Sequence, residues 1–307
     1  MAEHAFDTEN IFVYTGGDEV VPDDVTHVIV DKSVEIIPSE KFFKRRRLVS
    51  IKMHDGMVKI DHSAFYECVA LAGGIKLPGV KSVEAWAFSG SGLTNVEFGD
   101  KLETIRKSAF SNCHSLRDVK ALTARSIEAY AFSDCHHLTD LELPEVKKIR
   151  KYAFIRCTRL RRVAVPLKYD LLDEDNIFHY CKSLTTVNLL GGIHKTISSL
   201  YMESWRNEMN AEIDRINQVL PNTHHLQKTR VIQQWIESVL ESIEHFKMVH
   251  CILLKEALIV LELAIWKAKL DENGEEKLQL GATRNELNIT SGASIVIENV
   301  LPFLALE

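Results

Sequence analysis

The chain has 307 residues, of which 46% are hydrophobic and 26% charged, so it can bury a substantial core and has an ordinary globular composition. Its net charge of -6 is mild, so we expect neither nucleic acid nor an anionic membrane as a partner. The first ten residues, MAEHAFDTEN, lack the basic start and apolar run of a secretory signal. We therefore expect a cytosolic location, with the nucleus as the alternative.

Residues 1–24 are expected to form a leader before the regular part of the chain. The apolar run at 10–14 is followed by turn signals at Gly16, Gly17 and Pro22. Strand-like runs at 25–30 and 34–37 then indicate an imperfect first repeat. An atypical first unit is expected because a terminal repeat has a neighbour on one side only.

A motif of about 22 residues recurs through the next part of the chain. In each unit, a Leu-x-x-Leu-x-Leu run and a shorter run ending in Ile or Val predict two short strands. Alternation would place Leu141 and Leu143 inward and leave Asp140 and Glu142 outward. Units of this kind bury their apolar faces by stacking, with Phe on Phe. The predicted phenylalanine column is Phe43, Phe65, Phe88, Phe110, Phe132, Phe154 and Phe178, at spacings of 22, 23, 22, 22, 22 and 24.

The cysteines follow the same period. Five of the six share one position of the repeat, which predicts a ladder of small buried thiols rather than disulfides in a reducing compartment. The sequence has no CxxC pair, so a zinc ribbon is not expected. The ladder would consist of Cys68, Cys113, Cys135, Cys157 and Cys181, with Cys251 outside it.

The signature Ile-x-x-x-Ala-Phe-x-x-Cys-x-x-Leu stands out at 127–138 (IEAYAFSDCHHL) and 149–160 (IRKYAFIRCTRL). It resembles the repeat of the BspA-type leucine-rich-repeat family, over roughly residues 25–195. The resemblance implies an α/β repeat fold: a leucine-rich-repeat solenoid of stacked short parallel strands, with about seven to eight units of 22–24 residues. It also implies a protein-recognition or adhesion module without catalytic residues.

Three segments depart from the repeat. An extra residue at Gly73-Gly74 predicts a bulge, and 166–176 reads as a looped-out turn of the solenoid. The basic run KRRR at 44–47 lies on a predicted turn. This run could contact an acidic partner or act as a nuclear signal, but we favour the interpretation that it is a solvated turn.

After residue 192 the period changes to that of helices. Apolar positions from Trp205 to Leu220 and from Ile232 to Ala264 predict two helices over 196–271, separated at Pro221. We expect this hairpin to pack on the last repeat, near 184–197, and to cap the solenoid. The stretch 249–266 is nearly as long as a membrane span but carries three charges, so a buried or dimer-forming helix is expected. The tail at 272–307 is polar, with a short terminal helix capped by Ser291.

No catalytic constellation is visible. The 13 histidines lack HxxxH or HExxH spacing, and no P-loop, GxSxG or GxGxxG motif occurs. His114 and His136 share one repeat position, which accounts for them structurally. We therefore assign no catalytic, cofactor-binding or metal-ligating residue and expect no cofactor.

The outward positions of the predicted strands remain as a binding face, because solenoids recognise partners on extended surfaces. A merely solubilising surface is the alternative. We expect a non-enzymatic scaffold that recognises a protein partner of unknown identity. The rival interpretations are a helical oligomerisation module forming a homodimer beside passive repeats, an enzyme with an unfamiliar site, and a protein that binds membranes peripherally. The candidate partner-binding residues are Asn95, Glu97, Asp118, Lys120, Asp140, Glu142, Arg162, Thr186 and Asn188.

Overall fold

The computed structural model describes residues 11–172, 176–191, 197 and 202–272, and the statements below concern these residues. The chain divides into two compact units. The first is Met1–Gly191 with Asp214–Ser238, and the second is Gly192–Ile213 with Val239–Glu307. The predicted tail at 272–307, apart from Glu272 at the end of the last helix, lies outside the described residues, as does the expected cap at Ser291.

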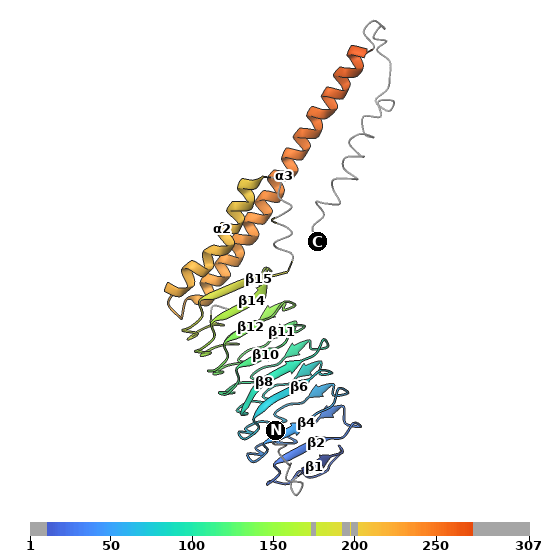
Figure 1. Cartoon of the computed structure of the whole chain (residues 1–307), viewed down its shortest axis with the longest axis vertical. Helices are drawn as coiled ribbons and strands as arrows, with labels where there is room; N and C mark the ends of the chain where they lie inside the picture. Colours follow the sequence, from blue (N-terminus) through green and yellow to red (C-terminus); the bar gives the residue numbers. More distant parts are fainter. Residues whose placement is uncertain (1–10, 173–175, 192–196, 198–201, 273–307) are drawn as a thin grey trace, which may run out of the picture. The chain divides into compact units, whose positions relative to one another are not determined.

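The repeats of the first unit stack into a solenoid with parallel sheets (Figure 1). One six-stranded sheet, here the long-strand sheet, consists of β6 (Gly73–Leu77), β8 (Leu93–Phe98), β10 (Asp118–Lys120), β12 (Asp140–Glu142), β14 (Arg162–Pro166) and β15 (Thr186–Leu190). The other, the short-strand sheet, consists of β3 (Ile36–Ile37), β5 (Lys59–Ile60), β7 (Ser82–Val83), β9 (Thr104–Ile105), β11 (Ser126–Ile127) and β13 (Lys148–Ile149).

Strand register follows the period of the sequence. Val119 lies opposite Val96, and Ile127 lies between Ile105 and Ile149, so each strand pairs with its equivalent in the next repeat. The predicted solenoid of stacked short parallel strands is therefore confirmed. The predicted bulge is also present, since the pairing of β6 with β8 shifts register between Gly73 and Gly74.

A smaller parallel sheet begins the solenoid. β1 (Ile11–Tyr14) pairs with β2 (His27–Val30), which pairs with β4 (Ser50–Lys52). The stretch expected as a leader thus contributes a strand, and the Tyr14 side chain is fully buried. At the other irregular segment, 167–172 contains no strand, and an isolated bridge from Leu172 to Ile149 connects it to the previous repeat.

A column of stacked phenylalanine rings forms the centre of the core. Consecutive rings lie 5.0–5.7 Å apart and nearly parallel, and all are at most 1% exposed. The prediction that Phe43 begins this column is wrong. Phe42 stacks on Phe65 and is fully buried, whereas Phe43 stacks on Tyr66 at the surface. The column is Phe42, Phe65, Phe88, Phe110, Phe132, Phe154 and Phe178.

Turns form the remaining side of each repeat. Alternate amides bond to the next repeat, as from Phe110 N–H to Ala131 O at 2.8 Å and from Asn112 N–H to Ser133 O at 2.8 Å. Two positions of each turn before the last adopt left-handed backbone, for example Tyr130 (φ 59°) and Asp134 (φ 59°). This conformation costs roughly 1–2 kcal/mol in a non-glycine residue, so the hydrogen-bonded stack must hold it in place.

Two helices follow the repeats. α2 runs over Glu203–Val219, a 3-10 turn η2 over Leu220–Asn222, and α3 over Lys228–Glu272. Pro221 lies at the start of the 3-10 turn, as the predicted break between the helices required. Within the second unit, Trp205 of α2 stacks on Phe246 of α3 with 5.3 Å between ring centroids. Among the described residues, no helix is both long enough and apolar enough to cross a membrane.

Residues of 214–238 contact the last repeat within the first unit. Asn217 Oδ1 accepts a hydrogen bond from Val187 N–H of β15 at 2.8 Å, and Thr229 Oγ1 accepts one from Phe178 N–H at 2.9 Å. Lys228 Nζ donates to Lys182 O at 3.2 Å and to Leu184 O. These bonds satisfy backbone groups of the last turn that have no following repeat. Apolar side chains of the same segment are buried as well, at Ile216, Leu220, Ile232, Trp235 and Ile236.

Candidate interaction surfaces

The outer face of the long-strand sheet carries all nine predicted partner-binding residues. They alternate with buried residues, as the strand period requires: Asp118 and Lys120 are exposed on either side of buried Val119. Strand register arranges them in two columns. One column is Asn95, Asp118, Asp140, Arg162 and Thr186, and the other is Glu97, Lys120, Glu142 and Asn188, with buried Ala164 before Asn188.

Charges in the second column pair across the strands. Glu97 lies between two lysines, 3.5 Å from Lys76 Nζ and 3.6 Å from Lys120 Nζ. Arg162, from the neighbouring column, donates to Glu142 Oε1, with Nη1 at 3.1 Å. Exposed pairs of this kind contribute little stability, typically about 0.2–1 kcal/mol each.

The first column differs because two of its carboxylates have no such partner. The side chains of Asp118 and Asp140 are exposed, and their carboxylates form no hydrogen bond or ion pair with the part of the chain that is described. Lys120 lies opposite Glu142 in the neighbouring strand, so Asp118 and Asp140, two residues earlier in each strand, face each other with their backbones about 5 Å apart across the sheet. Like charges this close repel, and a cation from a partner would relieve that repulsion.

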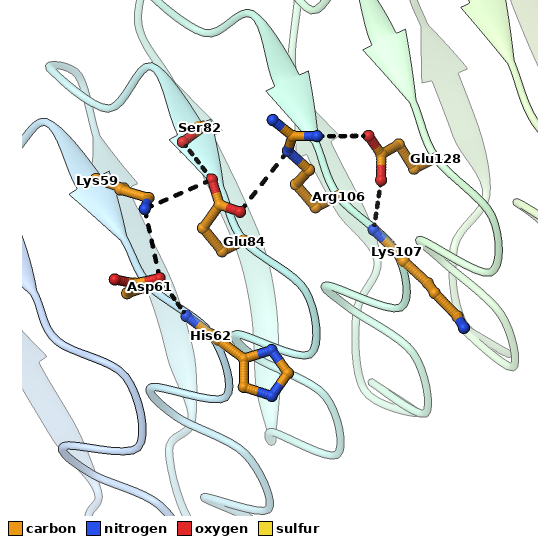
Figure 2. Close-up of polar contacts among 8 residues, drawn as sticks. All are labelled: Lys59, Asp61, His62, Ser82, Glu84, Arg106, Lys107 and Glu128. Carbon is orange, nitrogen blue, oxygen red and sulfur yellow. Dashed lines mark hydrogen bonds and ion pairs between the residues drawn. The ribbon is translucent and has the colours of Figure 1, made fainter.

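The short-strand sheet carries a continuous polar network (Figure 2). Lys59 Nζ lies 3.4 Å from Asp61 and 4.0 Å from Glu84, and Ser82 Oγ donates to Glu84 at 2.9 Å. Arg106 then bridges Glu84 at 3.7 Å and Glu128 at 3.1 Å.

Figure 2 also shows how the ends of this network are held. Asp61 accepts a hydrogen bond from His62 N–H at 2.8 Å, and Glu128 accepts one from Lys107 N–H at 3.2 Å. Each carboxylate therefore has a donor within the same molecule. This leaves the short-strand sheet less charge to offer a partner than Asp118 and Asp140 offer on the other sheet.

Aromatic side chains gather on the turns, which the sequence analysis missed. Tyr130 stacks on Tyr152 with 5.0 Å between ring centroids, and the Arg156 guanidinium lies 5.8 Å from the ring centroid of Tyr180. Tyr180 is 39% exposed and also contacts His225 at 5.1 Å. The signal was present in the sequence, since Tyr130 and Tyr152 precede the Ala-Phe pair by one residue in adjacent repeats. Tyr and Arg are frequent anchors of protein interfaces.

The basic run at 44–47 is divided between surface and interior. Arg45 occupies the repeat position of the ladder cysteines, and its guanidinium binds Val21 O at 2.8 Å and Asp23 at 2.9 Å. Lys41 binds the carbonyls of Gly17 and Glu19 at 3.0 and 2.9 Å. Arg46 is 64% exposed and pairs with Glu67. The run does lie on a turn, but part of it holds the loop that precedes β2.

The ladder cysteines are free and buried. Each thiol donates to a phenylalanine carbonyl of the preceding repeat, as from Cys135 Sγ to Phe110 O at 3.2 Å. Burial raises the pKa of Cys68 to about 12 and that of Cys113 to about 11. A reactive cysteine needs an accessible thiolate, so these side chains are suited to packing rather than to nucleophilic chemistry.

The histidines of the repeats also take structural positions. His114 and His136 stack with 5.0 Å between ring centroids, and their Nδ1 atoms lie 3.0 and 2.9 Å from the carbonyls of Asp134 and Arg156. Across the described residues, no three His, Cys, Asp or Glu side chains group as metal ligands.

A shallow pocket of about 210 Å³, open solvent included, lies where 168–172 meets Gln233, Ile236 and Glu237. Small-molecule sites usually span about 300–1,000 Å³.

Comparison with known families decides the class of the protein. The model of the BspA type leucine rich repeat region matches residues 23–124 and 120–218, in six copies. The chain belongs to this family. The BspA-type repeat fold supports a role as a protein-interaction scaffold in general. No curated protein matches the sequence.

Solved leucine-rich repeat proteins are similar to parts of this BspA-type chain. One from Bacteroides ovatus is 21% identical, with 54% of this chain and 61% of that chain covered and a TM-score of 0.40. A leucine rich cell surface protein from Faecalibacterium prausnitzii is 20% identical over 55% and 61%, with a TM-score of 0.38. One from T. pallidum is 22% identical over 59% and 74%, with a TM-score of 0.40. The match thus spans about three fifths of the first two chains.

Proposed function

We propose that this protein is a non-enzymatic scaffold whose long-strand sheet recognises a protein partner. The observation that carries the proposal is the column of Asn95, Asp118 and Asp140, a polar stripe with two adjacent carboxylates that pair with no cation among the described residues. Lysine or arginine side chains of a partner would supply that cation, and the extended sheet would supply the area that a stable interface needs.

The helical segment 214–238 has a second part in the proposal, as the cap of the solenoid. Asn217, Lys228 and Thr229 bond to backbone groups of the last repeat, and Ile216, Leu220 and Trp235 of the same segment are buried. A cap of this kind would block the addition of further strands to β15 and keep the binding sheet in register.

The test neutralises the unpaired carboxylates while the fold is kept. Asp118→Asn with Asp140→Asn should reduce affinity for a partner recovered by crosslinking from native cytosol at least about tenfold, since two charge contacts are lost. A matched control, Asp61→Asn with Glu128→Gln, alters two carboxylates of the short-strand sheet and should leave that affinity unchanged. Melting curves would verify that both variants fold.

Equal binding by the native chain and the Asp118/Asp140 variant would rule out this face. The aromatic surface of Tyr130, Tyr152 and Tyr180 is the second candidate, because it carries the side chains most often found at interface hot spots. Tyr152→Ala with Tyr180→Ala would then be the variant that loses the partner.

A further inference from the structure

The last two turns of the solenoid, with the segment that precedes α3, carry a group of basic and aromatic side chains. The Arg156 guanidinium lies 5.8 Å from the ring centroid of Tyr180, and the Tyr180 ring lies 5.1 Å from that of His225. His224 contacts His225 with 4.2 Å between ring centroids. Lys182 follows Tyr180 in the same turn, and its amide donates to Tyr180 O at 2.9 Å. We call these five residues, all in the first unit, the basic corner.

Positive charge is concentrated around the basic corner. Burial lowers the pKa of His225, and neighbouring basic groups, led by His224 and Lys182, lower it further. Helix α3 begins at Lys228, so the partial positive charge of its N-terminus adds to the field here. The adjoining segment 146–169 contains nine Lys and Arg residues and no Asp or Glu. The electrostatic field at the corner therefore favours an anion.

The described part of the chain neutralises little of this charge. Asp134 Oδ1 lies 3.6 Å from Arg156 Nη1 at the surface. Lys182, His224 and His225 form no ion pair with a described carboxylate. The side chains of Lys182 and His224 are exposed. A carboxylate from outside would thus meet accessible donors and would compete with Asp134 for Arg156.

We propose that the basic corner binds an acidic segment of a protein partner. Carboxylates of that segment accept charge-assisted hydrogen bonds from Arg156 and Lys182, and an aromatic or apolar residue beside them packs on exposed Tyr180. The inference rests on the proposed role of the chain as a protein scaffold. It concerns a surface and a sign of charge different from those of the carboxylate column on the long-strand sheet.

A polypeptide fits this surface better than a nucleic acid does. Each turn leads directly into the long-strand sheet, which exposes Asp118 and Asp140, and the whole chain has a net charge of -6. A nucleic acid carries a negative charge at every nucleotide, so it would be repelled wherever it ran past the corner. A protein segment can carry its acidic residues at the corner and neutral or basic residues elsewhere.

The first test uses a labelled octaaspartate peptide and measures its binding to the full chain by fluorescence anisotropy. We expect saturable binding that weakens as salt is added. Arg156→Gln with Lys182→Gln should weaken it about tenfold or more, because two charge-assisted contacts are lost. Lys81→Gln with Lys101→Gln is the matched control, since it removes two exposed cations from the connections before β7 and β9. It should leave the dissociation constant unchanged.

The second test reverses the charge of the corner. Arg156→Glu with Lys182→Glu should lose octaaspartate and bind an octalysine peptide about fivefold or more tightly than the native chain binds it. Any binding of octalysine to Asp118 and Asp140 is common to both chains, so the difference reports on the corner. A variant that had merely lost its fold would gain no ligand, and melting curves would verify folding independently.

Three results would overturn the proposal. Two of them, no saturable binding of octaaspartate by the native chain and equal binding by the Arg156→Gln/Lys182→Gln variant, would exclude the corner as a site for acidic segments. The third, tighter binding of a single strand of eight thymidines that the same variant loses, would assign the corner to nucleic acid. Octaaspartate offers no cation to Asp118 or Asp140, so each of these results leaves the proposal for the long-strand sheet standing.

Discussion

At the scale of single residues, the ladder position shows how one contact holds adjacent repeats together. The thiol of Cys157 donates to Phe132 O at 3.1 Å, and the equivalent Ser91 places its hydroxyl 3.4 Å from Cys113 Sγ. The first turn has Arg45 instead, whose longer side chain reaches the carbonyl of Val21. A small thiol fits between two repeats, whereas a long cation fits where one neighbour is an open loop.

These buried thiols predict a dependence of stability on alkaline pH. Burial raises the thiol pKa to about 11 for Cys113 and about 12 for Cys181, against an ordinary value of 9.0. Below pH 9 both folded and unfolded chains keep these protons, so the stabilising contribution is complete. Above pH 9 the unfolded chain ionises first, and the free energy of unfolding falls as pH rises towards 11.

Variants of single cysteines isolate this contribution. The pKa of Cys135 is raised well above 9.0, chiefly by burial, so Cys135→Ala should reduce the slope of stability against pH. The expected reduction is about 1.4 kcal/mol per pH unit between pH 9 and 11, measured by urea unfolding. Cys251→Ser replaces an exposed thiol and should keep the native slope. An unchanged slope in Cys135→Ala would contradict the prediction.

At the scale of elements, both ends of the solenoid use side chains to satisfy backbone groups. Lys41 and Arg45 bind carbonyls of the loop at 17–21, and Lys228 binds carbonyls of the last turn. Lys228 is 2% exposed, and burial lowers its pKa. Ammonium and guanidinium groups suit these positions because a parallel stack that ends leaves carbonyls without an amide partner.

The buried hydroxyl of Thr229 gives a sharp test of this closure. Thr229→Val keeps the shape but removes the acceptor for Phe178 N–H, leaving a buried amide unsatisfied. We expect a loss of about 1–3 kcal/mol in the free energy of unfolding, measured in urea. Thr223→Val is the control, since its hydroxyl bonds to Val219 O at an exposed site, and it should change stability by less than about 0.5 kcal/mol. Equal effects would argue against a special part for Thr229.

At the scale of the whole molecule, the first unit is a linear stack in which each repeat contacts its neighbours in sequence. Stability in such a stack is approximately a sum over neighbouring interfaces. Under the proposed capping role, segment 214–238, which bonds to the last repeat, forms the last of these interfaces. Removing that segment takes away the hydrogen-bond partners of Val187 N–H, Lys182 O and Leu184 O. The helices are therefore expected to matter for folding even where they bind no partner.

A chain ending at Lys195 tests this expectation. It lacks Asn217, Lys228 and Thr229, and we expect it to melt about 10 °C or more below the full chain, followed by circular dichroism. Lys228→Met in the full chain removes the contacts of one side chain alone, and it should lower the melting midpoint by a smaller amount. Identical midpoints for the short and full chains would exclude a capping role.

Much of the fold and of the candidate site follows from local sequence. Residues repeating every 22 positions can bury their apolar sides only by stacking, so the columns of Phe and Cys and the parallel strands were predictable. Period-2 alternation identified Asp118 and Lys120 as outward residues, and the 3.6-residue period identified the two helices. Each of these inferences needs only the spacing of residue types along the sequence.

Contacts between turns were decided by tertiary structure. Phe42 and Phe43 are chemically identical neighbours, and only packing against Phe65 selects which ring enters the core. Nothing in the sequence distinguishes Arg45 and Lys228 from surface cations, because their carbonyl partners come from other turns. Spacing along the chain placed Asp118 and Asp140 on one face of the sheet. That their carboxylates find no cation among the described residues depends on how far side chains reach across repeats, which only the structure shows.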